Sequence, residues 1–129
     1  MTGKEARGIR EQYGFSLEEV STALGYTQRQ AIHRIENMNK VPNTYRNSLK
    51  LLEQKCISIY VVLDYYIKNH GEIDHQDYQI LYKKNRIVKI TIRRRFVKEL
   101  SKLMSAFPFK EFGYDKNTGF SCIQFEYKV

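Results

Sequence analysis

Tryptophan is absent from this sequence of 129 residues, which has only two cysteines, two prolines and no long apolar run. A membrane-spanning helix needs about 20 apolar residues, so none is predicted. The N-terminus lacks the apolar segment of a secretory signal, which predicts a cytoplasmic protein with no membrane partner. Cys56 and Cys122 have no second Cys or His at metal-binding spacing, so we expect reduced thiols, no metal and no cofactor.

Acidic residues are scarce relative to basic ones. The 14 Asp and Glu residues stand against 22 Lys and Arg, which gives a net charge of +8 and indicates an anionic partner. A hydrophobic content of 42% with 28% charged residues describes a globular chain. The length suits one ordinary domain or two very small ones.

The first half of the chain contains strong signals for short helices. Thr2 with Glu5, and Ser16 with Glu19, have the spacing of capping boxes, and Gly25 stands where a C-cap glycine is expected. A third helix is predicted to begin at residues 27–28, and a fourth covers residues 44–55. The apolar side chains expected inside these last two helices are Ala31, Ile32, Ile35, Tyr45, Leu49 and Leu52.

The second half mixes helix and strand signals. Residues 56–71 are rich in β-branched and aromatic side chains, but their apolar residues fit one helical face, so we expect a helix. Residues 72–82 form an acidic connector with at most one helical turn. A half-buried strand at 85–95, a helix at 96–107 and a β-hairpin with the five-residue loop 115–119 follow. The inward residues are Ile59, Val62, Leu63, Tyr66 and Ile67 in the helix and Val88, Ile90 and Ile92 in the strand.

These signals predict a mainly α N-terminal part followed by a small α+β unit. We expect a helix-turn-helix domain of four to five helices over residues 1–55. An α+β domain with a β-hairpin covers residues 56–129 and serves dimerisation or effector binding. The boundary is expected near residues 53–57.

The stretch TQRQAIHRIEN, residues 27–37, has too few apolar side chains for a helix that only fills a core. A helix-turn-helix places its second helix in a major groove, where Gln pairs with adenine and Arg with guanine. Base contacts are expected from Gln28, Arg29, Gln30, His33, Arg34 and Asn37. Phosphate contacts are expected from Thr27, Asn39, Lys40, Asn43, Tyr45 and Arg46. A solvated helix face and a soluble loop are the alternatives.

Residues 2–54 resemble the Cro/repressor-type (XRE) family of helix-turn-helix regulators. The similar stretches are MTGKEARGIREQYGFSLEEVSTALGY, then QAIHRIEN, KVP and LKLL. The resemblance implies DNA binding and a salt bridge between Arg10 and Glu36. It also implies a homodimer on a palindromic operator.

The chain departs from the family pattern at three places. Leu17 stands where Gln is usual, and the turn before the third helix is one residue longer. Met38 stands where Gly is usual, and Asn39 is expected to supply the left-handed backbone conformation instead.

The most basic stretch is residues 83–102, with nine basic side chains and one acidic one. A second basic surface is therefore predicted, made of Lys83, Lys84, Arg86, Lys89, Arg93, Arg94, Arg95 and Lys98. It can follow a nucleic-acid backbone or meet an acidic protein. The alternative is an edge strand whose charges prevent aggregation.

No catalytic constellation emerges, and we expect no enzyme. His70 and His75 flank Asp74 and Asp77, but the segment has no further partner for metal or acid–base chemistry. His33 likewise lacks a Cys or second His nearby. The aromatic side chains of the hairpin are Phe109, Phe112, Tyr114, Phe120, Phe125 and Tyr127. We expect them to build a core rather than a platform for stacking single-stranded bases.

Two functions follow from these observations. The first is a sequence-specific regulator of transcription that binds double-stranded DNA, a repressor or autoregulator of a phage or mobile element. The alternative is a bifunctional protein whose residues 56–129 bind and inhibit a protein partner, as anti-CRISPR proteins or antitoxins do, while the N-terminal domain represses its own operon. An RNA-binding module is a third, weaker option.

Overall fold

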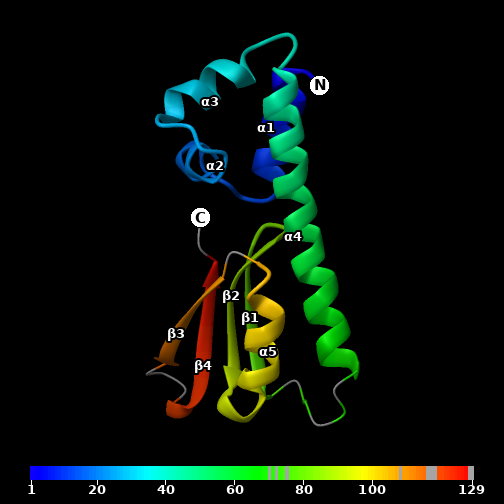
Figure 1. The fold of residues 1–129 in the computed structure, drawn as a ribbon, viewed down its shortest axis with the longest axis vertical. Helices are drawn as coiled ribbons and strands as arrows, with labels where there is room; N and C mark the ends of the chain where they lie inside the picture. The colour runs from blue at the N-terminus through cyan, green and yellow to red at the C-terminus, as the bar shows by residue number, and fades with distance from the viewer. Residues whose placement is uncertain (70, 72, 75, 108, 116–118, 128–129) are drawn as a thin grey trace. The chain divides into compact units, whose positions relative to one another are not determined.

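The computed structural model describes residues 1–69, 71, 73–74, 76–107, 109–115 and 119–127 (Figure 1). The side chains of residues 94, 97, 110–115 and 119–124 lie outside this description. The chain separates into two compact units. Unit 1 contains residues 1–57 and 84–86, and unit 2 contains residues 58–83 and 87–127. The predicted class is confirmed, since helices dominate the first half and an α+β unit follows.

Unit 1 is built from α1 (Gly3–Gln12), α2 (Leu17–Ala23), α3 (Arg29–Glu36) and the first part of α4 (Asn43–Asn69). Both predicted capping boxes are present. The hydroxyl of Thr2 accepts a hydrogen bond from the Glu5 N–H at 3.1 Å, and that of Ser16 accepts one from Glu19 at 3.0 Å. Gly25 follows α2 with a φ of 79°, the left-handed conformation that favours glycine. Local sequence signals therefore account for the starts of α1 and α2 and for the end of α2, whereas no side-chain cap hydrogen bond starts α3.

Helix α4 is one continuous helix, so the prediction of two helices over 44–55 and 56–71 is wrong. No glycine or proline occurs between Asn43 and Asn69, and nothing in the local chemistry stops the helix there. The chain passes from unit 1 to unit 2 between residues 57 and 58. The expected boundary at 53–57 is thus the interior of a helix rather than a linker.

The core of unit 1 lies among its helices. Its buried apolar side chains are Ala6, Tyr13, Phe15, Val20, Ile32, Ile35, Val41, Tyr45, Leu49, Leu52 and Cys56. Cys56 carries a free thiol, and burial raises the pKa of that thiol to about 11. Such a thiol is protonated near neutral pH and behaves as a small apolar side chain. The side chain of Cys122 lies outside the described residues.

Unit 2 contains a sheet of four strands in the order β1-β2-β4-β3. The strands are β1 (Tyr78–Lys83), β2 (Arg86–Arg93), β3 (Phe109–Asp115) and β4 (Gly119–Tyr127). Strand β4 pairs antiparallel with β2 and with β3, which confirms the predicted hairpin. Asp115 and Gly119, which were both expected in the loop, instead pair with each other across β3 and β4. Strand β1 replaces the predicted connector, because Tyr78 and Ile80 pack against the core of unit 2.

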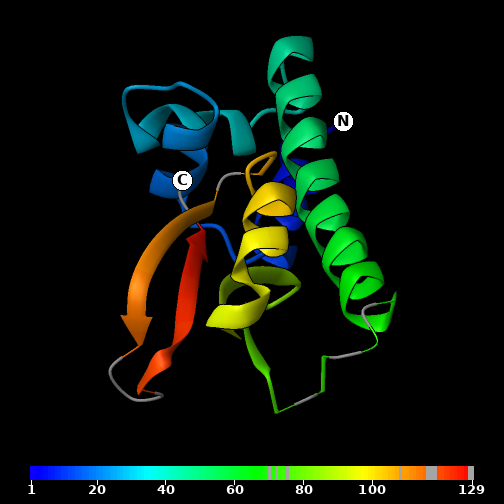
Figure 2. The same ribbon diagram turned by 60° about the horizontal axis from the view of Figure 1, so that its bottom comes forward.

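The second part of α4 and α5 (Val97–Met104) cover one face of this sheet, as Figures 1 and 2 show. A 3-10 turn, η1 (Arg94–Phe96), connects β2 to α5. The buried core residues are Ile59, Leu63, Tyr66, Ile87, Ile90, Ile92, Phe96, Leu100, Met104 and Phe125. Ile90 and Ile92 point inward as predicted, but Val88 is only half-buried and Thr91 is buried. In the described part of the chain, no helix combines the length and apolarity needed to cross a membrane.

Candidate nucleic-acid interface

Helix α3 is attached to unit 1 by a narrow apolar side. Ile32 and Ile35 are buried, and Ala31, which was expected inside, is half-buried. The remaining buried residue of the helix is the charged Glu36. A helix held by so few apolar side chains leaves most of its surface to the solvent.

The predicted base-reading side chains all lie on the exposed surface of α3 and its two ends. They are Gln28, Arg29, Gln30, His33, Arg34 and Asn37. Within the part of the chain that the structure describes, Arg29, Gln30 and Arg34 have no hydrogen-bond or ion-pair partner. Asn37 caps the C-terminus of the helix, because its Nδ2 donates to the carbonyl of His33 at 2.9 Å. The guanidinium groups of Arg29 and Arg34 and the amide of Gln30 therefore remain available to an external partner.

A buried ion pair fixes the C-terminal end of α3. Nε of Arg10 lies 2.7 Å from Oε2 of Glu36, and Nη2 lies 3.0 Å from Oε1. Nη1 of Arg10 donates to the carbonyl of Phe15 at 3.0 Å. The hydrogen bond with Glu36 is the main cause that raises the pKa of Arg10. The pair implied by the family resemblance is therefore present in this chain.

The first residue of α1 also contacts α3, a contact that the sequence analysis missed. A Cβ on Gly3 would lie 2.7 Å from the carbonyl oxygen of Ile35 and closer still to the backbone of Glu36. The Gly3 N–H donates to the carbonyl of Met38 at 2.9 Å. The sequence signal was a glycine at the first position of a helix, where alanine is the better helix former.

The turn between α2 and α3 is fixed by hydrogen bonds to Ser21. Its hydroxyl donates to the carbonyl of Tyr26 at 3.0 Å, and its own carbonyl accepts the Tyr26 N–H at 2.8 Å. The ring of Tyr26 packs edge-on against Tyr45, with 6.0 Å between the centroids. The turn between α2 and α3, one residue longer than in the family pattern, is thus held in place by the contacts of Ser21, Tyr26 and Tyr45.

The predicted phosphate-contacting residues divide into two groups. Thr27, Asn39, Lys40 and Asn43 are exposed. The prediction for Tyr45 is wrong, because this side chain is only 1% exposed and belongs to the core, where burial raises the pKa of its phenol. Arg46 is half-buried, with its Nε inside the protein.

The left-handed conformation expected at Asn39 is absent. Among the described non-glycine residues, only Lys84 has a positive φ, 55°. Asn37, with a φ of −97°, ends the helix instead. The chain therefore turns from α3 toward α4 without the glycine that the family pattern contains.

The predicted second basic surface is not a single surface, and Arg86 shows this most clearly. Its guanidinium, 3% exposed, lies inside unit 1. It donates to the carbonyls of Tyr13 at 3.0 Å and Gly14 at 3.3 Å and pairs with Glu19 at 3.2 Å. It also lies over the ring of Phe15, 4.2 Å from the centroid. Arg86 is a structural residue and contributes nothing to a basic surface.

Other members of the predicted surface are paired within unit 2. Arg93 Nε lies 2.8 Å from a carboxylate oxygen of Asp77, and Arg95 lies 3.6 Å from the same oxygen. The carboxylate of Asp77 also accepts the Asp74 N–H at 2.9 Å. Lys89 faces Glu126 across the β2–β4 ladder.

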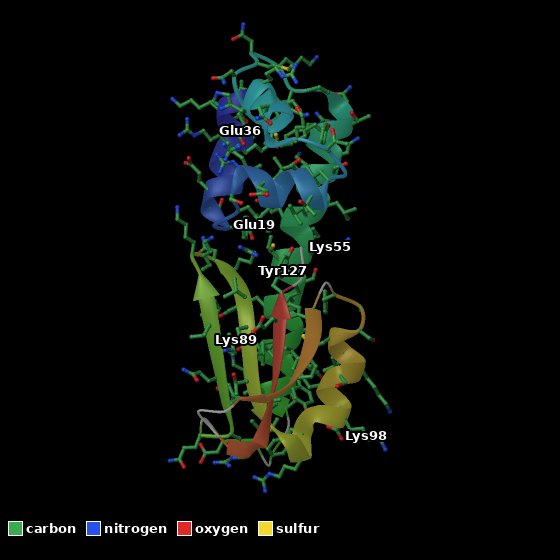
Figure 3. All side chains as sticks on the ribbon, turned by 90° about the vertical axis from the view of Figure 1, so that its left-hand side faces the viewer. Glu19, Glu36, Lys55, Lys89, Lys98 and Tyr127 are labelled. Atoms are coloured by element: carbon green, nitrogen blue, oxygen red, sulfur yellow. The ribbon has the colours of Figure 1, made fainter. Side chains whose placement is uncertain are left out.

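The remaining lysines are spread over different elements. Figure 3 shows Lys89 on the sheet and Lys98 on α5. Lys83, Lys84 and Lys98 are exposed, and the side chain of Arg94 lies outside the described residues.

Two minor predictions have mixed outcomes. Phe125 is buried, and the rings of Phe109 and Tyr127 pack edge to face at 5.6 Å, as expected for a core. The side chains of Phe112, Tyr114 and Phe120 lie outside the described residues.

His70 and His75 also lie outside the described residues. Asp77 serves the ion pairs with Arg93 and Arg95. In the described portion, no three His, Cys, Asp or Glu side chains are close enough together to hold a metal ion.

Comparisons with known proteins return no match to this chain among family models, curated proteins or solved structures.

Proposed function

We propose that unit 1 binds double-stranded DNA with α3 in the major groove and that the protein regulates transcription in this way. The observation that carries the proposal is the surface of α3. Its cations and amides are all exposed, while Ile32, Ile35 and Glu36 hold the other side of the helix in the unit. An ordinary surface helix also exposes a polar face. What distinguishes α3 is that the exposed side chains of Arg29, Gln30 and Arg34 have no partner within the described residues.

The chemistry of the exposed side chains suits base edges. A major groove about 12 Å wide admits one α-helix. The amide of Gln30 can pair with adenine, and the guanidinium groups of Arg29 and Arg34 can pair with guanine. Because Arg29 and Arg34 have no partner within the described residues, binding DNA breaks no internal ion pair.

Phosphate contacts are expected on both sides of α3. Thr27 precedes the helix, and Lys40 and Asn43 follow it, all with exposed side chains. Such contacts set the position and orientation of a protein on the duplex without reading sequence. Binding at a defined site then represses a promoter that overlaps it.

The alternative function through residues 83–102 has less support. It requires one basic surface, but Arg86 is buried in unit 1 and Arg93 is paired with Asp77. Among the described side chains of this stretch, the exposed cations are lysines on different elements and Arg95, which lies 3.6 Å from Asp77.

A selection from randomised double-stranded oligonucleotides tests the proposal. We expect the full chain to enrich one defined motif. The variant with Arg29→Ala and Arg34→Ala should enrich none. The matched control is Lys50→Ala with Lys55→Ala, which removes the same charge from exposed positions of the same unit and should retain the motif. Equal losses in both double variants would show that only net charge drives binding.

A further inference from the structure

The surface of unit 2 carries an apolar ridge on α4. The ridge consists of Tyr60, Val61 and Tyr65, whose side chains are 50%, 57% and 69% exposed. Ile59 and Leu63, on another side of the same helix, are fully buried in the core. Helix α4 therefore carries large apolar side chains on two sides, one buried in the core of unit 2 and one exposed in the described structure. Clustered large apolar side chains at such exposure mark interaction sites.

A groove runs beside this ridge between α4 and α5, two helices that lie side by side in Figures 1 and 2. Its volume is about 540 Å³. Its lining residues are Val61, Val62, Tyr65, Tyr66, Asn69, Glu99 and Leu103. Asn69 and Glu99 are its only polar lining residues in the described structure, so the groove suits an apolar occupant.

We propose that the ridge and groove bind the same surface of a second copy of the chain, with the two α4 helices antiparallel about a two-fold axis. Such an axis near Val61 and Tyr65 places the ridge of each copy in the groove of the other. This is ridge-into-groove packing of helices in an isologous interface. The inference requires no DNA and stands apart from the proposed function of unit 1.

The charges at this surface favour a second copy over a nucleic acid. Residues 58–69 contain one acidic and one basic side chain, Asp64 and Lys68, and these pair at 3.0 Å. Two copies that each carry a net charge of +8 repel one another generally, but this neutral helix face adds no repulsion. The carboxylate of Glu99 in the groove would repel phosphate. A nucleic acid therefore gains little at this site.

The exposed area also matches a protein interface better than a small ligand. A tyrosine side chain offers about 150–250 Å² of surface, so Tyr60 and Tyr65 together expose roughly 180–300 Å² per copy. Two copies would bury about 350–600 Å² from these tyrosines alone, roughly 30–50% of a small stable interface of about 1,200 Å². Val61, Val62 and Leu103 add to this area. A small ligand in the groove would leave Tyr60 uncovered, since Tyr60 does not line it.

Sedimentation equilibrium of the full chain without DNA tests the inference. We expect the mass to rise with concentration from 15.4 kDa toward twice that value. Tyr65→Ala and Val61→Glu should each weaken association at least about tenfold, because a substitution in an isologous interface acts twice. Both side chains are exposed, so circular dichroism should show an unchanged fold and melting temperature.

Leu81→Ala is the matched control. Leu81 is an exposed apolar residue of unit 2 on β1, and it lines neither the α4–α5 groove nor the pocket between α4 and β1. This substitution should leave the association constant unchanged. A chain that stays monomeric at every concentration would overturn the proposal, and so would an equal effect of Leu81→Ala and Tyr65→Ala.

Cross-linking locates the axis independently. In a Tyr65→Cys variant, a short bis-maleimide should join two copies, whereas Leu81→Cys should give no more product than the parent chain with its two native cysteines. Cross-linking at Leu81 and not at Tyr65 would assign the interface to a different face and contradict the α4 pairing.

Discussion

Arg10 and Glu36 join the first and third helices of unit 1 through two parallel hydrogen bonds of 2.7 and 3.0 Å. Their side chains are only 11% and 5% exposed, so the pair is nearly buried. Burial changes the size of the effect expected when one partner is removed, since an isolated charge then remains inside the protein.

Arg10→Ala should lower the free energy of unfolding of unit 1 by about 3–5 kcal/mol, because Glu36 loses both hydrogen bonds. Urea unfolding followed by circular dichroism measures this. The control is Arg7→Ala, which removes an exposed pair with Glu11 at 2.9 Å on the same helix and should cost less than about 1 kcal/mol. Similar losses in the two variants would show that the buried pair contributes no more to stability than the exposed pair does.

Gly3→Ala should destabilise unit 1 by about 1–3 kcal/mol although alanine favours helices, since the new Cβ would overlap the end of α3. Gly8→Ala is the matched control. It lies in the same helix with open space around it and should be neutral or stabilising by up to about 1 kcal/mol. Thermal melts of both variants measure the difference. A stabilised Gly3→Ala protein would mean that α1 and α3 pack less closely.

Arg29→Ala and Gln30→Ala should each relax base preference at one or two positions of a half-site and cost about 1–3 kcal/mol of binding free energy. Both side chains are exposed and hold no internal contact in the described structure, so stability should not change. Binding to a set of singly substituted operators measures the preference. If both variants keep the affinity and the sequence preference of the parent chain, α3 is not the reading helix.

Lys40→Gln should reduce the slope of log K against log salt by about 0.9, the effect of one lost phosphate contact, without changing which operator is preferred. Lys89→Gln removes the same charge but should leave the slope nearly unchanged, because Lys89 lies opposite Glu126 in the sheet of unit 2. Titrations at several salt concentrations compare the two. A larger change of the slope for Lys89→Gln than for Lys40→Gln would support a second DNA-binding surface on unit 2.

Asp77→Asn should alter the acid stability of unit 2. The hydrogen bond from the Asp74 N–H, and then Arg95 and Arg93, hold the pKa of Asp77 below its ordinary value. The carboxylate therefore contributes stability above the unfolded-state pKa of about 3.9, and this contribution disappears as the pH falls through the lower folded value.

The parent chain should be the more stable one at pH 7, and the gap to Asp77→Asn should close on acidification. Urea unfolding at a series of pH values measures it. Asp64→Asn serves as control, since its pair with Lys68 is exposed and should matter little at any pH. A gap for Asp77→Asn that stays constant into acid would contradict this role.

The parts of the fold that the sequence predicts well are those with local causes. The capping boxes of Thr2 and Ser16 and the glycine after α2 act over three or four residues, so they can be recognised without a structure. The continuity of α4 does not follow from the sequence in this way, because the composition changes near residue 55 and such a change predicts a boundary. Composition does not stop a helix that contains no glycine or proline.

The candidate site shows the same division. Exposure on α3 follows from helical periodicity, and the structure places all six predicted base-reading side chains at the surface. The partners of Arg86 and Arg93 do not follow from periodicity. Arg86 pairs with Glu19, 67 residues away along the chain, and no local pattern marks that pairing. The sequence allows Tyr45 either in the core or in contact with a DNA phosphate. The structure shows that its side chain is packed in the core.

The assignment of residues 84–86 to unit 1 affects how this chain can change in evolution. The chain leaves unit 1 after residue 57, returns to it at 84 and leaves again after 86. A fragment that stops at residue 57 therefore lacks Arg86, whose guanidinium donates hydrogen bonds to the carbonyls of Tyr13 and Gly14. An exchange that carries residues 1–57 and 84–86 together therefore also carries residues 58–83 of unit 2.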